Sequence, residues 1–144
     1  MFTITEKPID VRILGQRMEN PAGGAVVTFE GRVRNHNEGL SVQGLDYQSY
    51  VPLAEVEGEK ILAEARARFD LLECQCVHRI GSLNIEEVAV WVGVISAHRG
   101  DAFDAARYII DEAKSRVPIW KRENLDSGQS YWVACHDEDT SGQT

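Results

Sequence analysis

Apolar and polar residues follow two different spacings along the chain, one typical of helices and one typical of strands. Ile9–Met18 has the spacing of a short amphipathic helix, and residues 20–24 form a turn rich in Gly and Pro. From residue 25 to residue 34, apolar or small residues alternate with polar ones, which predicts a strand. Arg32 and Arg34 fall on its polar face, and its buried face holds Ala25, Val27, Phe29, Gly31 and Val33.

The next segments predict a loop, a strand and a long helix. Residues 35–39 are polar and turn-forming, so we expect a loop, and Val42–Ser49 has the pattern of a second strand, antiparallel to the first. Pro52 opens a helix that runs to about Phe69. Gly58 lies on the apolar side of this helix. Glycine costs a helix about 1 kcal/mol, so its presence indicates close packing against a sheet.

The second half of the chain predicts a covered strand followed by a second long helix. Leu71–Ile80 is a strand, residues 81–87 form a turn or short ribbon, and Val88–Ala97 is apolar on both faces, which is typical of a central strand. A helix runs from about Gly100 to Arg116 and ends before Pro118. Its expected buried positions, continuing into the residue after it, are Phe103, Ala106, Ile110, Ala113 and Val117.

The chain closes with extended segments and an acidic tail. Ile119–Glu123 is predicted to be extended, residues 124–130 a turn, Tyr131–Cys135 a last strand, and residues 136–144 a frayed tail. Helices mixed with mostly antiparallel strands predict an α+β fold. No linker is long enough to separate two units, so we expect a single domain over residues 1–144.

Charge and composition narrow the functional classes. The chain is 43% hydrophobic and 26% charged, as in ordinary folded proteins, and its 15 Lys+Arg against 23 Asp+Glu give a net charge of -8. This balance repels nucleic acid and anionic membranes, so we expect neither as a partner. Residues 1–10 lack the apolar core of a signal peptide, and the three cysteines suit a reducing compartment. These features predict a cytoplasmic protein in which any anion site is a local cluster of basic residues.

Four short segments concentrate the basic residues; they are residues 31–37 (GRVRNHN), 78–81 (HRIG), 96–99 (SAHR) and 114–123 (KSRVPIWKRE). His98 and Arg99 lie where the central strand ends and a helix begins, and free N–H groups there favour an anion. An ordinary turn with a solvated arginine explains them equally well, because Asp101 and Asp104 can satisfy the helix N-terminus.

The lysines and the cysteines each allow two interpretations. Lys114 shares a stripe with Arg107 near the apolar face of its helix, where a half-buried amine can serve as acid, base or nucleophile. The commoner alternative is a lysine whose stem only covers apolar surface. Lys121 and Arg122 are adjacent in an extended segment, so only one of them faces a given site. Cysteines 74, 76 and 135 with residue His136 could bind zinc, but core packing is the simpler explanation.

The other sequence features add no candidate catalytic residue. His78 continues a core-facing row and is expected to be structural, and the tryptophans are expected to be core or interface anchors. Walker, dinucleotide-binding and zinc-protease motifs are absent, and no Ser-His-Asp set is evident. An enzyme built on these residues would therefore receive its attacking atom from a substrate or a partner.

The four basic segments, in order and in approximate spacing, resemble the molybdopterin synthase large (catalytic) subunit family. The resemblance covers the chain from about Gly24 to Val133. It implies an α/β hammerhead fold with additional antiparallel strands, and a homodimer within a heterotetramer. It also implies a small ubiquitin-like sulfur-carrier subunit whose C-terminal Gly-Gly ends in a thiocarboxylate. That sulfur is transferred to cyclic pyranopterin monophosphate, which gives the dithiolene of molybdopterin. We expect neither a cofactor nor a metal in this sulfurtransferase step of molybdenum cofactor biosynthesis.

The resemblance also assigns roles to individual residues. It implies that Lys114 and Lys121 are catalytic and that both also bind substrate. The other substrate contacts that it implies are Arg32, Val33, Arg34, His98, Arg99, Arg122 and Glu123. The short acidic tail after Val133 departs from the family's basic C-terminus. Two rival functions stay open at this point, a phosphodiesterase that uses the same basic pocket and a non-catalytic adaptor that docks a ubiquitin-like tail.

Overall fold

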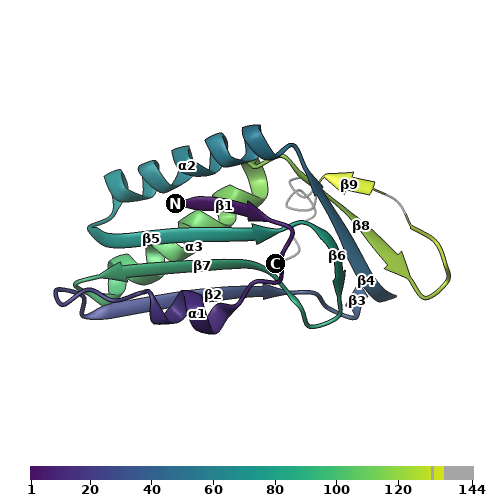
Figure 1. Ribbon diagram of the computed structural model, residues 1–144, viewed down its shortest axis with the longest axis horizontal. Helices are drawn as coiled ribbons and strands as arrows, with labels where there is room; N and C mark the ends of the chain where they lie inside the picture. The colour runs from purple at the N-terminus through teal and green to yellow at the C-terminus, as the bar shows by residue number, and fades with distance from the viewer. Residues whose placement is uncertain (131, 135–144) are drawn as a thin grey trace.

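Two β-sheets lie end to end in the computed structural model, which describes residues 1–130 and 132–134 (Figure 1). The first sheet has the order β1-β5-β7-β2. β1 pairs with β5 in parallel, and the other pairings are antiparallel. Its strands are β1 (Phe2–Thr5), β2 (Ala25–Arg32), β5 (Leu71–Arg79) and β7 (Val88–Ser96).

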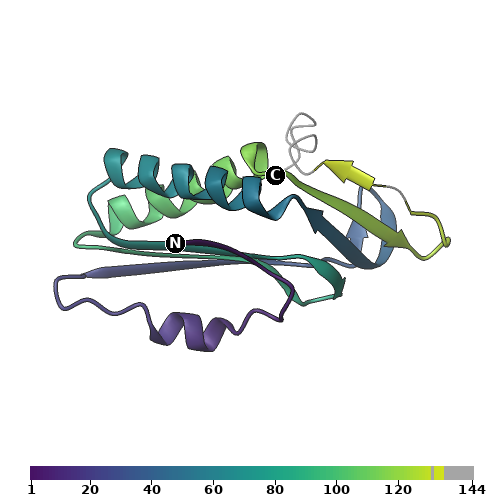
Figure 2. The ribbon, with the colours of Figure 1, turned by 45° about the horizontal axis from the view of Figure 1, so that its top comes forward.

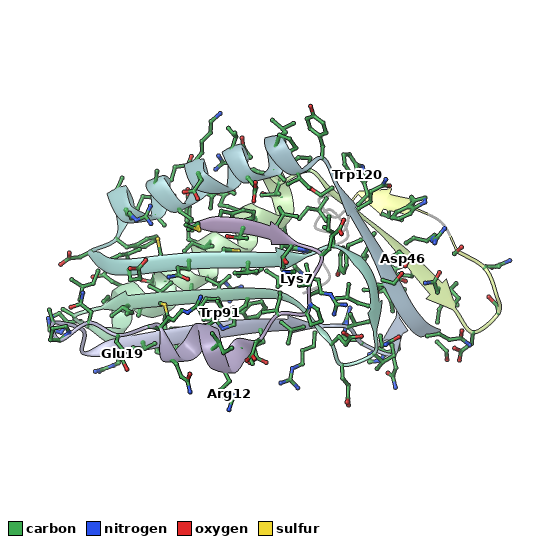
Figure 3. All side chains as sticks on the ribbon, in the orientation of Figure 1. Lys7, Arg12, Glu19, Asp46, Trp91 and Trp120 are labelled. Carbon is green, nitrogen blue, oxygen red and sulfur yellow. The ribbon has the colours of Figure 1, made fainter. Side chains whose placement is uncertain are left out.

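Helices cover both faces of this sheet. α2 (Val51–Arg68) and α3 (Arg99–Arg116) lie side by side on one face, and the short α1 (Val11–Gln16) lies on the other (Figure 2). β7 is buried along almost its whole length, as its two apolar faces predict. Its Trp91 packs with Met18 and Ile95 beneath the α1 segment (Figure 3), so this tryptophan is a core anchor.

Gly58 lets α2 lie directly on the edge strand β1. A β-carbon added at Gly58 would meet the Phe2 ring at 2.1 Å, which confirms the close packing that this glycine predicts. The same helix also satisfies the outer edge of β1. The Phe2 N–H donates to Glu59 Oε1 at 2.6 Å, and the Ile4 N–H donates to Glu55 Oε2 at 3.2 Å. α2 therefore closes one edge of the sheet, where open N–H groups would invite another strand.

The second sheet is built around β4 (Leu40–Ser49), which pairs with β3 (His36–Asn37), β6 (Gly81–Asn84) and β8 (Ile119–Leu125). β9 (Trp132–Ala134) adds to the outer side of β8. The expectation that the strand after residue 40 pairs with the strand at 25–34 is wrong, because β2 pairs with β7 instead. The loop expected at 35–39 is only partly right, because His36–Asn37 form the strand β3. Glu38 and Gly39 both have positive φ, at 50° and 80°, and make the tight turn of a β3–β4 hairpin.

The helices agree with the sequence pattern except on one face. α3 buries Ala102, Ala105, Ala106, Ile109, Ile110 and Ala113, whereas Phe103, expected in the core, is 62% exposed. The buried stripe of α3 runs through these positions, and Phe103 lies outside it. No helix within the described residues is long and apolar enough to cross a membrane. The fold is α+β with mostly antiparallel strands, as predicted. The acidic tail and the ends of the predicted strand 131–135 lie outside the described residues.

Candidate functional site

A pocket of about 110 Å³ lies where the two sheets meet the last turns of α3. It joins segments that are far apart in the chain, since β2, β4, β5, β7, α3 and β8 all contribute to its wall. Its apolar wall includes Phe29, Val90, Ile110 and Ile119. Its polar side chains are Arg32, Tyr47, His78, Lys114 and Lys121. Three cations thus gather in one cavity, although the chain as a whole is acidic.

Arg32 and Lys114 hold the outer part of the pocket. Arg32 lies at a β-bulge that shifts the register between β2 and β7 at Gly31/Arg32. Its side chain is 60% exposed and pairs with Glu30 at 2.9 Å. Lys114 lies in the last turn of α3 and is exposed, so the expectation of a half-buried amine is wrong. Both side chains are open to an incoming anion.

Lys121 lies deeper than these two residues and is held by a carboxylate. Its Nζ lies 3.2 Å from Glu123 Oε1, and the two side chains are only 12% and 14% exposed. They are two residues apart in β8, so they share one face of the strand. Asn37 Nδ2 donates to the same Glu123 oxygen at 2.7 Å. Burial is favourable for such a pair only when hydrogen bonds also satisfy the carboxylate, and Asn37 supplies one.

Arg122 points to the other side of β8, as the alternation of strand side chains predicts. Its Nη2 lies 2.8 Å from Asp46 Oδ2, and its guanidinium lies 5.0 Å from the centre of the Trp132 ring. Asp46, on β4 (Figure 3), also accepts hydrogen bonds from Ser82 and Asn124. The Ser82 hydrogen bond, with those from Arg122 and Asn124, lowers the pKa of Asp46 below its usual value. Arg122 therefore braces the sheet on the side away from the pocket.

Tyr47 and His78 form a polar wall that the sequence did not reveal as part of a site. Their rings meet edge to face with centroids 5.1 Å apart. His78 Nδ1 lies 2.8 Å from the Arg79 carbonyl oxygen. A carbonyl can only accept, so Nδ1 carries the proton and Nε2 is left as an acceptor. Burial, opposed by the hydrogen bond to the Arg79 carbonyl and reinforced by the charge of nearby Lys114, lowers the pKa of His78 to about 4, so the ring is neutral at pH 7.

Six of the nine expected site residues do not line this pocket, namely Arg122 and Glu123, which are described above, and Val33, Arg34, His98 and Arg99. Val33 is 3% exposed and packs into a core cluster with Val42 and Leu83. Arg34 lies beyond the end of β2 and is exposed. His98 and Arg99 are exposed at the N-terminal end of α3, whereas Lys114 lies in its last turn. Fifteen helical residues span roughly 22 Å, so these two residues cannot reach the pocket of their own chain.

The two described cysteines, Cys74 and Cys76, lie outside the pocket and do not form a zinc site. Cys74 and Cys76 are fully buried, and burial raises the pKa of Cys74 and raises that of Cys76 to about 12. A protonated, buried thiol is a weak nucleophile and a weak metal ligand. Within residues 1–130 and 132–134, no group of three or more His, Cys, Asp or Glu side chains is placed to hold a metal ion. Cys135 and His136, the other members of the zinc alternative, lie outside the described residues.

Similarity to known proteins extends over most of the chain. Residues 4–116 match the family model described as MoaE protein. The chain belongs to the MoaE family. A MoaE relative from Thermoplasma volcanium, named molybdopterin synthase catalytic subunit, is 45% identical over 90% of this chain and 94% of its own. The crystal structure of molybdopterin synthase from Staphylococcus aureus superposes with a TM-score of 0.84 at 37% identity, covering 90% of this chain and 94% of that one.

A more distant structure shows the same MoaE fold. It is the complex of subunits 1 and 2 of molybdopterin-converting factor from Helicobacter pylori, 22% identical, with a TM-score of 0.75 over 92% of this chain and 89% of that one. At this identity the likeness concerns the fold alone.

The pocket and the contacts that support it include side chains for which the sequence offered only weak signals. Tyr47 shares a strand face with the buried Leu45, so alternation could have pointed it inward. His78 was assigned to the core, and it is indeed hydrogen-bonded and mostly buried, yet it also forms part of the pocket wall. Asn37 lies in the basic segment 31–37, but its partner Glu123 is 86 positions away. Local sequence contains no signal for that contact.

Proposed function

We propose that this chain is the catalytic subunit of a molybdopterin synthase that acts in the cytoplasm. It would transfer sulfur from the C-terminal thiocarboxylate of a small ubiquitin-like carrier subunit to cyclic pyranopterin monophosphate. Two transfers would give the dithiolene of molybdopterin. Membership of the MoaE family and the names of its relatives support this proposal.

The observation that carries the proposal is the combination of side chains in the pocket. Arg32, Lys114 and Lys121 offer positive charge for a phosphorylated substrate. None of the described residues in its wall is a cysteine, a serine or a carboxylate. Such a pocket can bind an anion and stabilise developing negative charge, but it has no thiol or hydroxyl of the usual attacking kind. A thiocarboxylate that arrives on a partner supplies the sulfur nucleophile that these side chains lack.

Each of the three cations of the pocket then has a role in the proposed reaction. The carrier sulfur attacks the pterin and forms a thioester that still links it to the carrier, and Lys121, deep in the pocket beside Glu123, stabilises the negative charge that develops. Water then cleaves the acyl–sulfur bond, which leaves the sulfur on the pterin and releases the carrier as a carboxylate. Lys114, exposed at the outer part, moves protons or polarises the carbonyl of the carrier tail. Arg32 attracts the phosphate to the pocket. Arg122 and Val33 support the strands from behind rather than touching substrate.

A homodimer would complete the site. Arg34, His98 and Arg99 are expected to neutralise the cyclic phosphate so that its oxygen can leave as the ring opens. His98 and Arg99 lie roughly 22 Å along α3 from Lys114, so the second copy of the chain must bring them to the pocket.

Mixing two inactive variants, His98→Ala and Lys114→Ala, tests whether the two chains of a dimer share their pockets. Mixed dimers contain one intact pocket, so about a quarter of the wild-type activity should return if subunits exchange freely. No recovery after verified exchange would contradict shared pockets.

The decisive reaction is reconstitution from purified parts. The chain, the thiocarboxylated carrier and cyclic pyranopterin monophosphate should together give the dithiolene product, and omission of the thiocarboxylate should abolish it. Opening of the cyclic phosphate without the carrier would favour a phosphodiesterase. Carrier binding without any reaction of the pterin would favour an adaptor.

A further inference from the structure

We propose that Asn37 is a positioning residue for the sulfur-transfer reaction, acting through Glu123 to hold Lys121 in the pocket. Asn37 Nδ2 and Lys121 Nζ meet the same oxygen, Glu123 Oε1, at 2.7 and 3.2 Å. This inference rests on the proposed function, because it assigns Asn37 a role in the reaction attributed to the Lys121 pocket. Asn37 does not line that pocket itself.

The β3–β4 hairpin fixes where Asn37 lies. Asn37 pairs with Leu40 across a turn whose two residues, Glu38 and Gly39, have φ of 50° and 80°. Non-glycine residues seldom adopt such a φ, so the local backbone is specified tightly. The same strand β4 pairs with β8, with Leu45 opposite Glu123. One strand therefore connects the turn that presents Asn37 to the strand that presents Glu123 and Lys121.

The contact matters because the ion pair is largely buried. Lys121 and Glu123 are 12% and 14% exposed, so little water is available to satisfy the carboxylate or to hold its rotamer. A buried pair depends on further hydrogen bonds, and one that involves a charged group is stronger than a neutral one. Without the Asn37 amide, Glu123 can rotate and carry the Lys121 amine away from its working position. We therefore expect Asn37→Ala to lower the rate of dithiolene formation by about tenfold or more, with carrier binding unchanged.

An isosteric substitution separates positioning from general damage to the hairpin. Asn37→Asp keeps the shape, removes the N–H donor and puts a second carboxylate beside Glu123. Two adjacent carboxylates share a proton as the pH falls, and the protonated Asp can again donate to Glu123. The rate of Asn37→Asp relative to wild type should therefore rise as the pH is lowered, whereas the relative rate of Asn37→Ala should stay flat. A purely structural defect predicts a flat ratio for both variants.

The control is Asn35→Asp, which adds the same charge to the same hairpin at an exposed position whose side chain contacts only His36 among the described hydrogen bonds. It should match wild type. A double-variant cycle covers the case in which Asn37→Asp does not fold, because Asn37→Ala should cost little once Glu123→Gln has removed the carboxylate. A flat pH ratio, or an equal loss in both backgrounds, would overturn the positioning role. If the wild-type protein formed no dithiolene, the proposed function itself would be overturned, and Asn37 could not be a positioning residue for that reaction.

Discussion

His78 should make the protein lose stability when the pH falls below about 6.5. Its imidazole is neutral in the folded state because burial lowers the pKa from 6.5 to about 4. In the unfolded chain the same group is protonated below about 6.5. Between these two values the unfolded state binds more protons, so the free energy of unfolding must decrease as the pH decreases. This difference in pKa corresponds to a loss of about 3 kcal/mol in the free energy of unfolding, complete near pH 4.

The measurement compares wild type with His78→Gln by urea unfolding at several pH values between 7.5 and about 4, the window that this linkage defines. Asp46 and Glu64 also destabilise the fold on acidification, since hydrogen bonds lower their pKa, but they do so in both proteins. The difference between the two stability curves therefore isolates His78. We expect wild type to lose about 3 kcal/mol more than His78→Gln over this range. Parallel curves would refute the conclusion that His78 is buried in its neutral form.

Two further predictions test the packing around the site. Gly58→Ala should destabilise the protein by about 1–2 kcal/mol in thermal or urea unfolding, because the clash with Phe2 outweighs the gain in helix propensity. Gly15→Ala, the matched control in open space, should be neutral or stabilising, and a stabilising Gly58→Ala would contradict the packing. Cys74 and Cys76 should resist alkylation at pH 8 in the native protein and react after unfolding, because burial keeps both thiols protonated. Peptide mapping identifies the labelled cysteine, and rapid labelling of Cys74 or Cys76 in the native protein would contradict their burial.

Periodicity predicted the elements of this fold better than it predicted their partners. The buried strand at 88–96 and the two long helices follow directly from the spacing of apolar residues, because burial on one or two faces determines which nearby positions are apolar. The choice of partner strand produces no such local pattern. Consecutive strands usually pair, so β4 was expected beside β2, but β2 pairs with β7 and β4 starts a second sheet. Phe103 lies just outside the buried stripe of α3, and helical spacing alone does not fix where the edge of that stripe falls.

The candidate site was partly visible for the same reason. The basic segments identify Arg32, Lys114 and Lys121 as candidates, and strand alternation correctly separates Lys121 from Arg122. The contact between Asn37 and Glu123 spans 86 positions and exists only because β4 pairs with both β3 and β8. The length of α3 separates His98 from Lys114, because the two residues lie near opposite ends of this helix. Only a second copy of the chain, in the proposed homodimer, would bring His98 close to Lys114, and the pattern of one chain does not record such a contact.

The proposed place of sulfur transfer is the pocket that contains Lys114 and Lys121. The most direct test is the rate of dithiolene formation under excess thiocarboxylated carrier for Lys114→Ala and Lys121→Ala, with Lys60→Ala on the exposed face of α2 as the matched control. Each pocket variant should lose at least about 100-fold, as expected for removal of a group that stabilises charge in a transition state, and should still bind the carrier. Lys60→Ala should match wild type. Undiminished rates in both pocket variants would contradict the assignment of the reaction to this pocket.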